Sequence, residues 1–297
     1  MTSARPRSAE SLANASANAL AEPSAEAPIG VFDSGVGGLS VLRHIRAQLP
    51  HEHLMYFADS GHAPYGEKTE QYVVDRTLAV TDFLLEHGAK ALVVACNTAT
   101  VAAIKAVRAR YPDLPVVGVE PGLKPAVGAT RNGKVGVLAT ARTLKGEKFL
   151  QLREQISAAS NTEFLLQPAV GLVDLIEQGD LETPAIGAML ERYVAPLLDQ
   201  GADTLVLGCT HYPFIKTGIE RVLRDHARTD VTLIDTGDAV ARQLVRLLEA
   251  AGLLRVAQDD SAAEPTLRGY TTADVSALAP AFDKLLGLRP PVEKVDV

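Results

Sequence analysis

The sequence predicts an α/β protein with two pseudo-symmetric α/β domains, each built on a parallel sheet, and a cleft between them. Three observations lead to this fold class. Short apolar runs alternate with amphipathic stretches, the composition is 47% hydrophobic with 5% aromatic residues and no tryptophan, and one strand–cysteine unit occurs twice. Strands that are apolar throughout are typical of parallel sheets covered on both faces. Their alternation with helices predicts right-handed crossovers.

Eight apolar runs are predicted as strands, at 29–32, 53–58, 91–95, 115–119, 134–139, 163–167, 204–208 and 231–235. Two amphipathic stretches between them, 98–111 and 183–201, are predicted as helices. The 297 residues suffice for two modest domains. We expect residues 29–120 and 230–297 to form the first domain and residues 121–229 the second. The Ala/Ser/Glu-rich residues 1–28 lack a continuous apolar segment, which predicts a disordered tail rather than a signal peptide.

Charge and cysteine content exclude several functional classes. A net charge of -7 argues against a nucleic-acid binder but leaves a small acidic substrate open. Two cysteines, 113 positions apart, form no disulfide framework, and their spacing from histidines fits no zinc site. No stretch approaches the roughly 20 apolar residues that span a bilayer. We therefore expect a cytoplasmic protein with reduced thiols and no bound metal.

A glycine-rich turn, FDSGVGGLS (32–40), follows the first predicted strand and leads into a helix. Glycines allow a tight turn and close approach of a ligand, and a helix N-terminus presents free N–H groups to an anion. Gly35, Gly37 and Gly38 match part of a nucleotide-binding fingerprint, but Ser40 occupies the third glycine position. Asp59 lies where a ribose-binding acid would be expected. A weak mononucleotide site and a turn that packs helix on strand both stay open.

Polar residues gather at one predicted sheet edge. Asp33 and Ser34 end the first strand, and the polar loop ADSGHAPYGEKT (58–69) follows the second. The loop alone indicates a turn. It gains interest because ligands of parallel sheets collect at the carboxyl ends of strands, where Cys96 is also expected.

Cys96 and Cys209 end two matching segments, GAKALVVACNTAT (88–100) and GADTLVLGCTHYP (201–213). A lone buried cysteine usually packs as a small apolar residue. Here each precedes polar residues at a strand-to-helix turn, where a helix N-terminus lowers a thiol pKa. The hydroxyls of Thr98 and Thr210 could hold a carboxylate, and His211 could exchange a proton with Cys209.

Two thiols that flank one carboxylate-binding cleft suggest proton transfer on both faces of a carbon atom. Acyl transfer and thiol redox chemistry are alternatives. Acyl transfer needs only one nucleophile, and a redox pair normally lies close in sequence.

Six segments carry a resemblance to a known family: IGVFDSGVGGLSVL, YFADSGHAPYGEK, VVACNTATVAAI, VGVEPGLKPA, VGVLAT and LVLGCTHYPF. In this order they resemble the glutamate racemases of the aspartate/glutamate racemase family, from Ile29 to about Glu249. The resemblance implies two pseudo-symmetric α/β domains and an isomerase that interconverts L- and D-glutamate without a cofactor. The product D-glutamate would supply peptidoglycan synthesis and thereby cell-wall biogenesis and cell shape.

The resemblance also implies roles for individual residues. Cys96 and Cys209 would be the two bases, with Asp33 assisting the first thiol and His211 and Glu177 the second. Substrate binding would involve Asp33, Ser34, Tyr65, Gly66, Asn97, Thr98, Thr210 and His211.

Glu177 is assigned by matching the Gly-Leu-Val that precedes it. Ala169 and Val170 occupy the positions where the family usually has Cys-Pro. A solvated acid at a helix end is the alternative interpretation of Glu177.

The implied partner is the small molecule glutamate, with no nucleic acid required and no membrane; a homodimer is left open. A racemase for aspartate, or a hydantoin or maleate-type isomerase, would keep the cysteines and alter the side-chain pocket. A binding protein without catalysis, such as one that acts on gyrase, is the alternative from another class.

Overall fold

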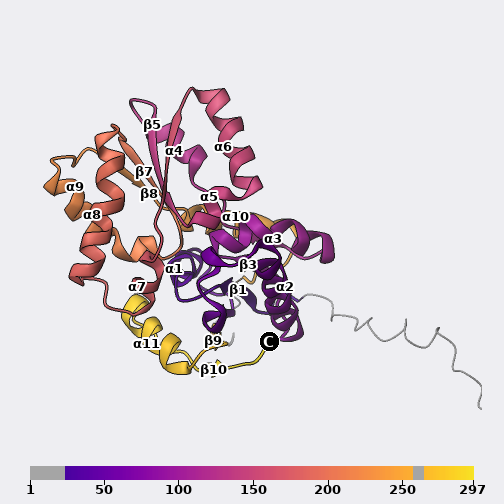
Figure 1. Cartoon of the computed structure of the whole chain (residues 1–297). Helices are drawn as coiled ribbons and strands as arrows, with labels where there is room; N and C mark the ends of the chain where they lie inside the picture. The colour runs from indigo at the N-terminus through magenta and orange to yellow at the C-terminus, as the bar shows by residue number, and fades with distance from the viewer. Residues whose placement is uncertain (1–23, 257–263) are drawn as a thin grey trace, which may run out of the picture.

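Two parallel sheets organise the computed structural model, which describes residues 24–256 and 264–297 (Figure 1). The first has six strands in the order β10 (Val292–Lys294), β9 (Leu267–Thr271), β2 (Leu54–Ala58), β1 (Ile29–Asp33), β3 (Ala91–Val94) and β4 (Val116–Gly118). The second has four strands in the order β6 (Glu163–Pro168), β5 (Lys134–Ala139), β7 (Thr204–Gly208) and β8 (Thr232–Ile234). All of their pairings are parallel.

Helices cover both faces of each sheet. The first sheet lies between α1 (Leu39–Gln48), α10 (Gly237–Ala250) and α11 (Val275–Leu286) on one face and α2 (Glu70–Glu86) and α3 (Asn97–Arg110) on the other. The second lies between α7 (Leu172–Glu177), α8 (Pro184–Asp199) and α9 (Lys216–Asp225) on one face and α4 (Leu123–Ala129), α5 (Ala141–Lys145) and α6 (Glu147–Ser160) on the other. Neighbouring strand residues such as Val31 and Phe32 therefore enter different cores, which explains the continuous apolar strands.

The structure confirms the predicted fold class and all eight predicted strands, whose ends shift by at most one residue. The sequence does not predict β9 and β10, because LRGYT and VEK contain no continuous apolar run. Both lie toward one edge of the first sheet, and β10 is the edge strand itself, so fewer of its side chains need to be apolar. No helix in the described part of the chain is long and apolar enough to cross a bilayer.

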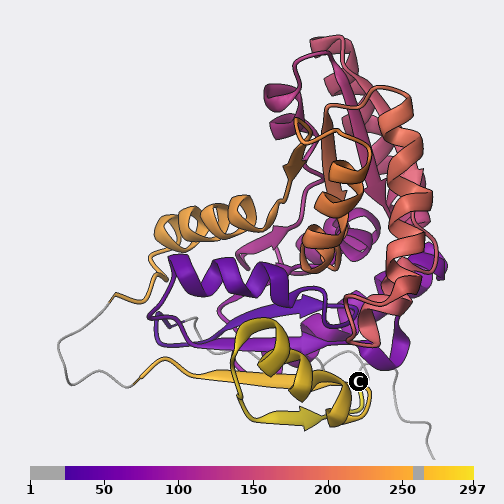
Figure 2. The same cartoon turned by 90° about the vertical axis from the view of Figure 1, so that its left-hand side faces the viewer.

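The two sheets form two lobes (Figure 2), which we propose as the two domains. Most of the predicted tail lies outside the described residues; of its described end, Glu26 pairs with Arg255 at 2.7 Å. Strand β8 belongs to the second sheet, although residues 230–297 were expected in the first domain. The sheet membership of β8 favours a return crossing at 235–237 instead of residue 230.

A buried ion pair fixes the start of β3 to the segment before β2. Lys90 Nζ lies 2.5 Å from Glu52 Oε2, and both side chains are at most 1% exposed. Burial lowers the pKa of Lys90, and the hydrogen bond to Glu52 opposes that effect. A second Glu52 oxygen accepts the backbone N–H of Arg255 at 2.9 Å, so this carboxylate joins three segments of the first lobe.

We expect Lys90→Met to lower the free energy of unfolding by about 3–5 kcal/mol, because Glu52 would remain as an unpaired buried charge. Urea denaturation followed by circular dichroism measures the change. The control is Arg131→Met, which breaks the exposed pair Arg131–Asp230, with side chains 60% and 52% exposed. The control should cost less than about 1 kcal/mol. Equal losses in the two variants would contradict the importance of the buried pair.

Candidate active site

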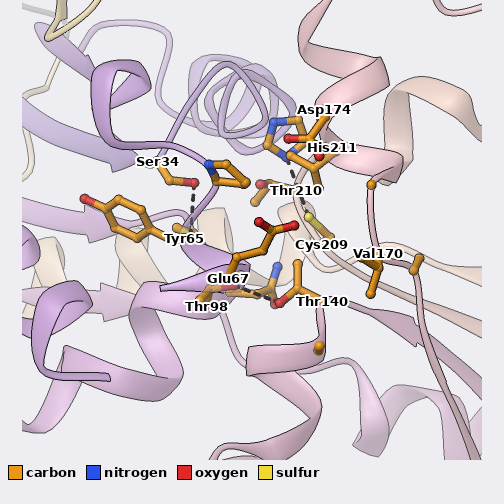
Figure 3. Close-up of a pocket in the computed structure, with 18 residues that line it drawn as sticks. Ser34, Tyr65, Glu67, Thr98, Thr140, Val170, Asp174, Cys209, Thr210 and His211 are labelled. Atoms are coloured by element: carbon orange, nitrogen blue, oxygen red, sulfur yellow. Dashed lines mark hydrogen bonds between the residues drawn. The ribbon is translucent and has the colours of Figure 1, made fainter. Parts of the chain in front are cut away.

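A cavity lies between the two lobes, where the carboxyl ends of strands from both sheets meet (Figure 3). Its empty volume, including open solvent at the mouth, is about 560 Å³. Both cysteines line it, Cys96 from the first lobe and Cys209 from the second. The chain therefore brings together two thiols that stand 113 positions apart in the sequence.

Cys96 follows β3 and is the N-cap of α3. Its Sγ accepts the backbone N–H of Ala99 at 3.4 Å and lies 3.6 Å from the hydroxyl oxygen of Ser34. Burial, with the nearby negative charge of Asp33, raises the pKa of Cys96 to about 12. The expectation that the helix N-terminus lowers this pKa was therefore wrong for Cys96: the desolvation penalty on the thiolate exceeds the stabilisation by the hydrogen bonds with Ala99 and Ser34. Burial thus favours the thiol form of Cys96 over the thiolate.

Cys209 follows β7 and lies beside an imidazole and a carboxylate. Its Sγ is 3.6 Å from His211 Nδ1, and His211 Nε2 is 2.5 Å from Glu177 Oε1. Burial alone lowers the pKa of His211, but the hydrogen bonds to Cys209 and Glu177 raise it well above its usual value. The pKa of Glu177 is lowered: burial raises it, and the hydrogen bond from His211 outweighs that effect. These hydrogen bonds favour the protonated form of the imidazole, which lies between a carboxylate and a sulfur atom.

Asp33 lies behind the cavity and joins the two lobes. It is fully buried, and its Oδ1 accepts the Gly35 N–H at 2.9 Å while its Oδ2 accepts the Thr210 hydroxyl at 2.8 Å. Burial raises the pKa of Asp33, and nearby His211 and these two donors oppose the rise. Asp33 thus fixes the Thr210 side chain of the second lobe against the glycine turn of the first.

The glycine turn is shaped for contact with the second lobe. A Cβ on Gly35 would lie 2.1 Å from Glu177 Oε1, and a Cβ on Gly37 would lie 2.4 Å from His211 Nδ1. The neighbouring Val36 N–H donates to Glu177 at 2.9 Å. Protein side chains therefore occupy the space that a nucleotide phosphate would need, which disfavours the mononucleotide interpretation. The packing interpretation describes Gly38, whose Cβ would meet Asp33, Tyr56 and Ala95 at 2.6, 2.9 and 3.2 Å.

The loop after β2 forms one wall of the cavity through Pro64, Tyr65, Gly66 and Glu67. The Tyr65 hydroxyl points away from the cavity (Figure 3) and donates to Asp59 at 2.5 Å. Asp59 is fully buried and also accepts from Arg76, at 2.8 and 2.9 Å, and from Thr272, at 2.9 Å. Asp59 thus anchors this wall and has no free oxygen for a ribose.

The structure places most of the predicted site residues on the cavity. The predicted residues that line it are Ser34, Tyr65, Gly66, Cys96, Asn97, Thr98, Cys209, Thr210 and His211. Asp33 and Glu177 do not line it but are hydrogen-bonded to Thr210 and His211, which do. In the described part of the chain, the buried amide oxygen of Asn97 has no hydrogen-bond partner, which indicates a free acceptor at the cavity.

The sequence argument missed Thr140 and Thr143. The Thr98 hydroxyl lies 3.0 Å from that of Thr140 and 3.3 Å from that of Thr143, so the three hydroxyls form a cluster across the lobes. Thr140 follows β5 directly and caps α5. The signal was available, because Thr140 ends a parallel strand at the same sheet edge as Cys209.

Within residues 24–256 and 264–297, no group of three or more His, Cys, Asp or Glu side chains is placed to hold a metal ion.

This combination of fold and site defines a class: a two-lobed α/β protein with paired thiols in the cleft between its lobes. Residues 29–244 match the family model described as Asp/Glu/Hydantoin racemase, and the chain belongs to this family.

Individual relatives agree. The chain is 57% identical over 232 residues to a glutamate racemase of Pseudomonas syringae pv. tomato, covering 78% of this chain and 82% of that protein. It is 52% identical over 273 residues to one of Ralstonia pickettii, covering 92% and 93%. The crystal structure of the Francisella tularensis glutamate racemase in complex with D-glutamate superposes with a TM-score of 0.78 at 29% identity, covering 92% and 98%.

We expect Gly37→Ala to lower kcat/KM at least about 100-fold, because its Cβ would displace His211 and Thr210 from their positions at the cavity. Racemisation kinetics measure the effect, and circular dichroism reports whether the fold is kept. Gly128→Ala in α4 is the control, since a Cβ there meets nothing within 4 Å. Activity of Gly37→Ala within threefold of the control would contradict the close approach of the lobes.

Proposed function

We propose that this protein is a glutamate racemase that interconverts L- and D-glutamate without a cofactor, with Cys96 and Cys209 as the two bases. One observation carries the proposal: two thiols, one from each lobe, line a single small cavity, and each has its own polar partners. Family membership and the names of close relatives support glutamate as the substrate.

In the proposed reaction one sulfur atom takes up the α-proton of the substrate, and the other sulfur atom gives its own proton to the α-carbon. One thiolate removes the α-proton from one face of the amino acid and becomes a thiol. The opposite thiol then protonates the other face of the carbanion and becomes a thiolate. The reverse reaction restores both groups. Unequal surroundings of the two thiols support this proposal: burial raises the pKa of Cys96 to about 12, and the imidazole of His211 lies 3.6 Å from Cys209 Sγ.

The α-proton is weakly acidic, so the developing charge on the α-carboxylate must be stabilised. The Thr98 hydroxyl and the N–H groups at the start of α3 are donors at the cavity, whereas the Thr210 hydroxyl donates its proton to Asp33. The free amide oxygen of Asn97 is an acceptor for the substrate ammonium group. Ser34 and the backbone of Tyr65 and Gly66 complete the proposed contacts on the first lobe.

We propose that burial between the two lobes keeps water from these groups, which strengthens each hydrogen bond in the cavity. Cys96 and Cys209 are 5% and 7% exposed. We propose Asp33 as the group that assists Cys96, and His211 with Glu177 as the relay that assists Cys209.

We further propose that the protein works in the cytoplasm and supplies D-glutamate for peptidoglycan, with neither nucleic acid nor membrane as a partner. A homodimer belongs to the same proposal and is tested by its mass in solution. The second candidate substrate is aspartate, since the family model spans aspartate, glutamate and hydantoin racemases. Optical rotation with L-glutamate and L-aspartate in parallel distinguishes the two.

We expect Cys96→Ser and Cys209→Ser each to lower racemisation of glutamate by about 10⁴-fold or more, because each removes one acid–base group. Each variant should still exchange the α-proton of one enantiomer with solvent, and the two variants should act on opposite enantiomers. Optical rotation measures racemisation, and proton NMR in deuterium oxide measures exchange. Thr81→Ser, which changes a buried helix residue away from the cavity, should stay within twofold of the parent. Racemisation that survives either cysteine change contradicts the proposal.

A further inference from the structure

Ser40 is a buried hydroxyl that bridges the two lobes and has no part in the proposed mechanism. It stands in the first turn of α1, where the nucleotide fingerprint would have its third glycine, and it is 2% exposed. Its Oγ donates to the backbone carbonyl of Thr210 at 2.8 Å. Ser40 belongs to the first lobe and Thr210 to the second, so this bond requires the two lobes to be in contact.

The Thr210 carbonyl depends on Ser40 because, in the described part of the chain, the turn that follows Thr210 supplies no N–H donor to it. Pro213, three residues further on, has no backbone N–H to close a turn. The N–H of Phe214 donates to the carbonyl of His211 at 3.2 Å, and that of Tyr212 donates to the carbonyl of Cys209 at 3.1 Å. The hydroxyl of Ser40 therefore satisfies a carbonyl that the turn itself leaves unpaired.

The position of this carbonyl matters because it belongs to the peptide group between Thr210 and His211. A peptide group is planar, so holding its oxygen also holds the direction in which the chain enters His211. His211 Nδ1 must stay 3.6 Å from Cys209 Sγ, and Nε2 must stay 2.5 Å from Glu177. A loss of the Ser40 bond would thus misplace the imidazole that serves Cys209.

The other thiol is independent of Ser40. The contacts of Cys96 are with Ser34 and the N–H of Ala99, both in the first lobe. We propose that Ser40 is a positioning residue that sets the alignment of His211 with Cys209 and leaves the Cys96 side of the cavity unaffected. The inference rests on the proposed function for its kinetic consequence but not for its effect on thiol reactivity.

The first experiment uses thiol reactivity and needs no substrate. Iodoacetamide alkylation of each cysteine, followed by peptide mass spectrometry, is compared in the parent and in Ser40→Ala. We expect the Cys209 rate to fall about fivefold or more, because a displaced imidazole would no longer lie 3.6 Å from Sγ and assist removal of its proton. The Cys96 rate should stay within twofold. Equal changes at both cysteines would mean that Ser40 only holds the lobes together, and no change at either would also overturn the proposal.

The second experiment measures α-proton exchange in variants that keep one base. Adding Ser40→Ala to Cys96→Ser should lower the remaining exchange about tenfold, because a buried carbonyl loses its partner and the turn relaxes. Adding it to Cys209→Ser should leave exchange within twofold. Similar losses in both backgrounds would overturn the proposal. Failure of the single-cysteine variants to exchange at all would count against the proposed function, and alkylation would still decide the role of Ser40.

Two variants separate the hydroxyl from general stability. Ser40→Thr keeps the hydroxyl and should restore both readouts to within threefold of the parent. Ser157→Ala removes a hydroxyl that donates to the Thr162 carbonyl within the second lobe, and it should change neither cysteine's reactivity. A Ser40→Thr variant that is folded but behaves like Ser40→Ala would contradict a role for the hydrogen bond.

Discussion

The site depends on one steric constraint: the backbone of the first lobe approaches side chains of the second lobe too closely for any Cβ to fit. Gly35 and Gly37 provide this approach, and Glu177, His211 and Thr210 fill the space that they leave. The Val36 N–H, the Asp33 carboxylate and the Ser40 hydroxyl then bond across the same contact. Cys96 and Cys209 line the same cavity, and because Glu177 and His211 are held at this contact, the imidazole of His211 stays beside Cys209.

The two lobes repeat one design but give their thiols different surroundings. Each thiol follows an interior strand of a parallel sheet, at the carboxyl end where ligands of such sheets collect. Burial and the nearby carboxylate of Asp33 favour the thiol form of Cys96, and the hydrogen bonds with Ala99 and Ser34 oppose that effect. Cys209 instead lies 3.6 Å from the imidazole of His211, which is also hydrogen-bonded to Glu177. A reaction in which one sulfur atom accepts a proton and the other donates one needs this difference, because two thiols contain no base and two thiolates contain no acid.

The sequence alone predicted those features of the fold and the site that local sequence patterns determine. Continuous apolar runs predicted β1 to β8, and the repeated strand–cysteine unit predicted that Cys96 and Cys209 would share a cleft. It did not predict the edge strand β10, whose side chains are mostly exposed, nor the membership of β8 in the second sheet. The partners of Gly37 and Ser40 lie about 170 positions away, so only the folded chain could identify them. The expectation of a lowered pKa for the Cys96 thiol was wrong, because the burial of this side chain depends on packing that the sequence around one strand end does not show.

The central claim is that two sulfur atoms on opposite faces of the substrate divide the proton transfer, and isotope incorporation tests it most directly. Unlabelled L-glutamate is converted in deuterium oxide, and both enantiomers are analysed by mass spectrometry at low conversion. Two bases predict D-glutamate that carries deuterium at its α-carbon, with the remaining L-glutamate still protiated. Early D-glutamate that retains substantial substrate protium, or an L-pool that gains deuterium as fast as D-glutamate forms, would show that a single base serves both faces.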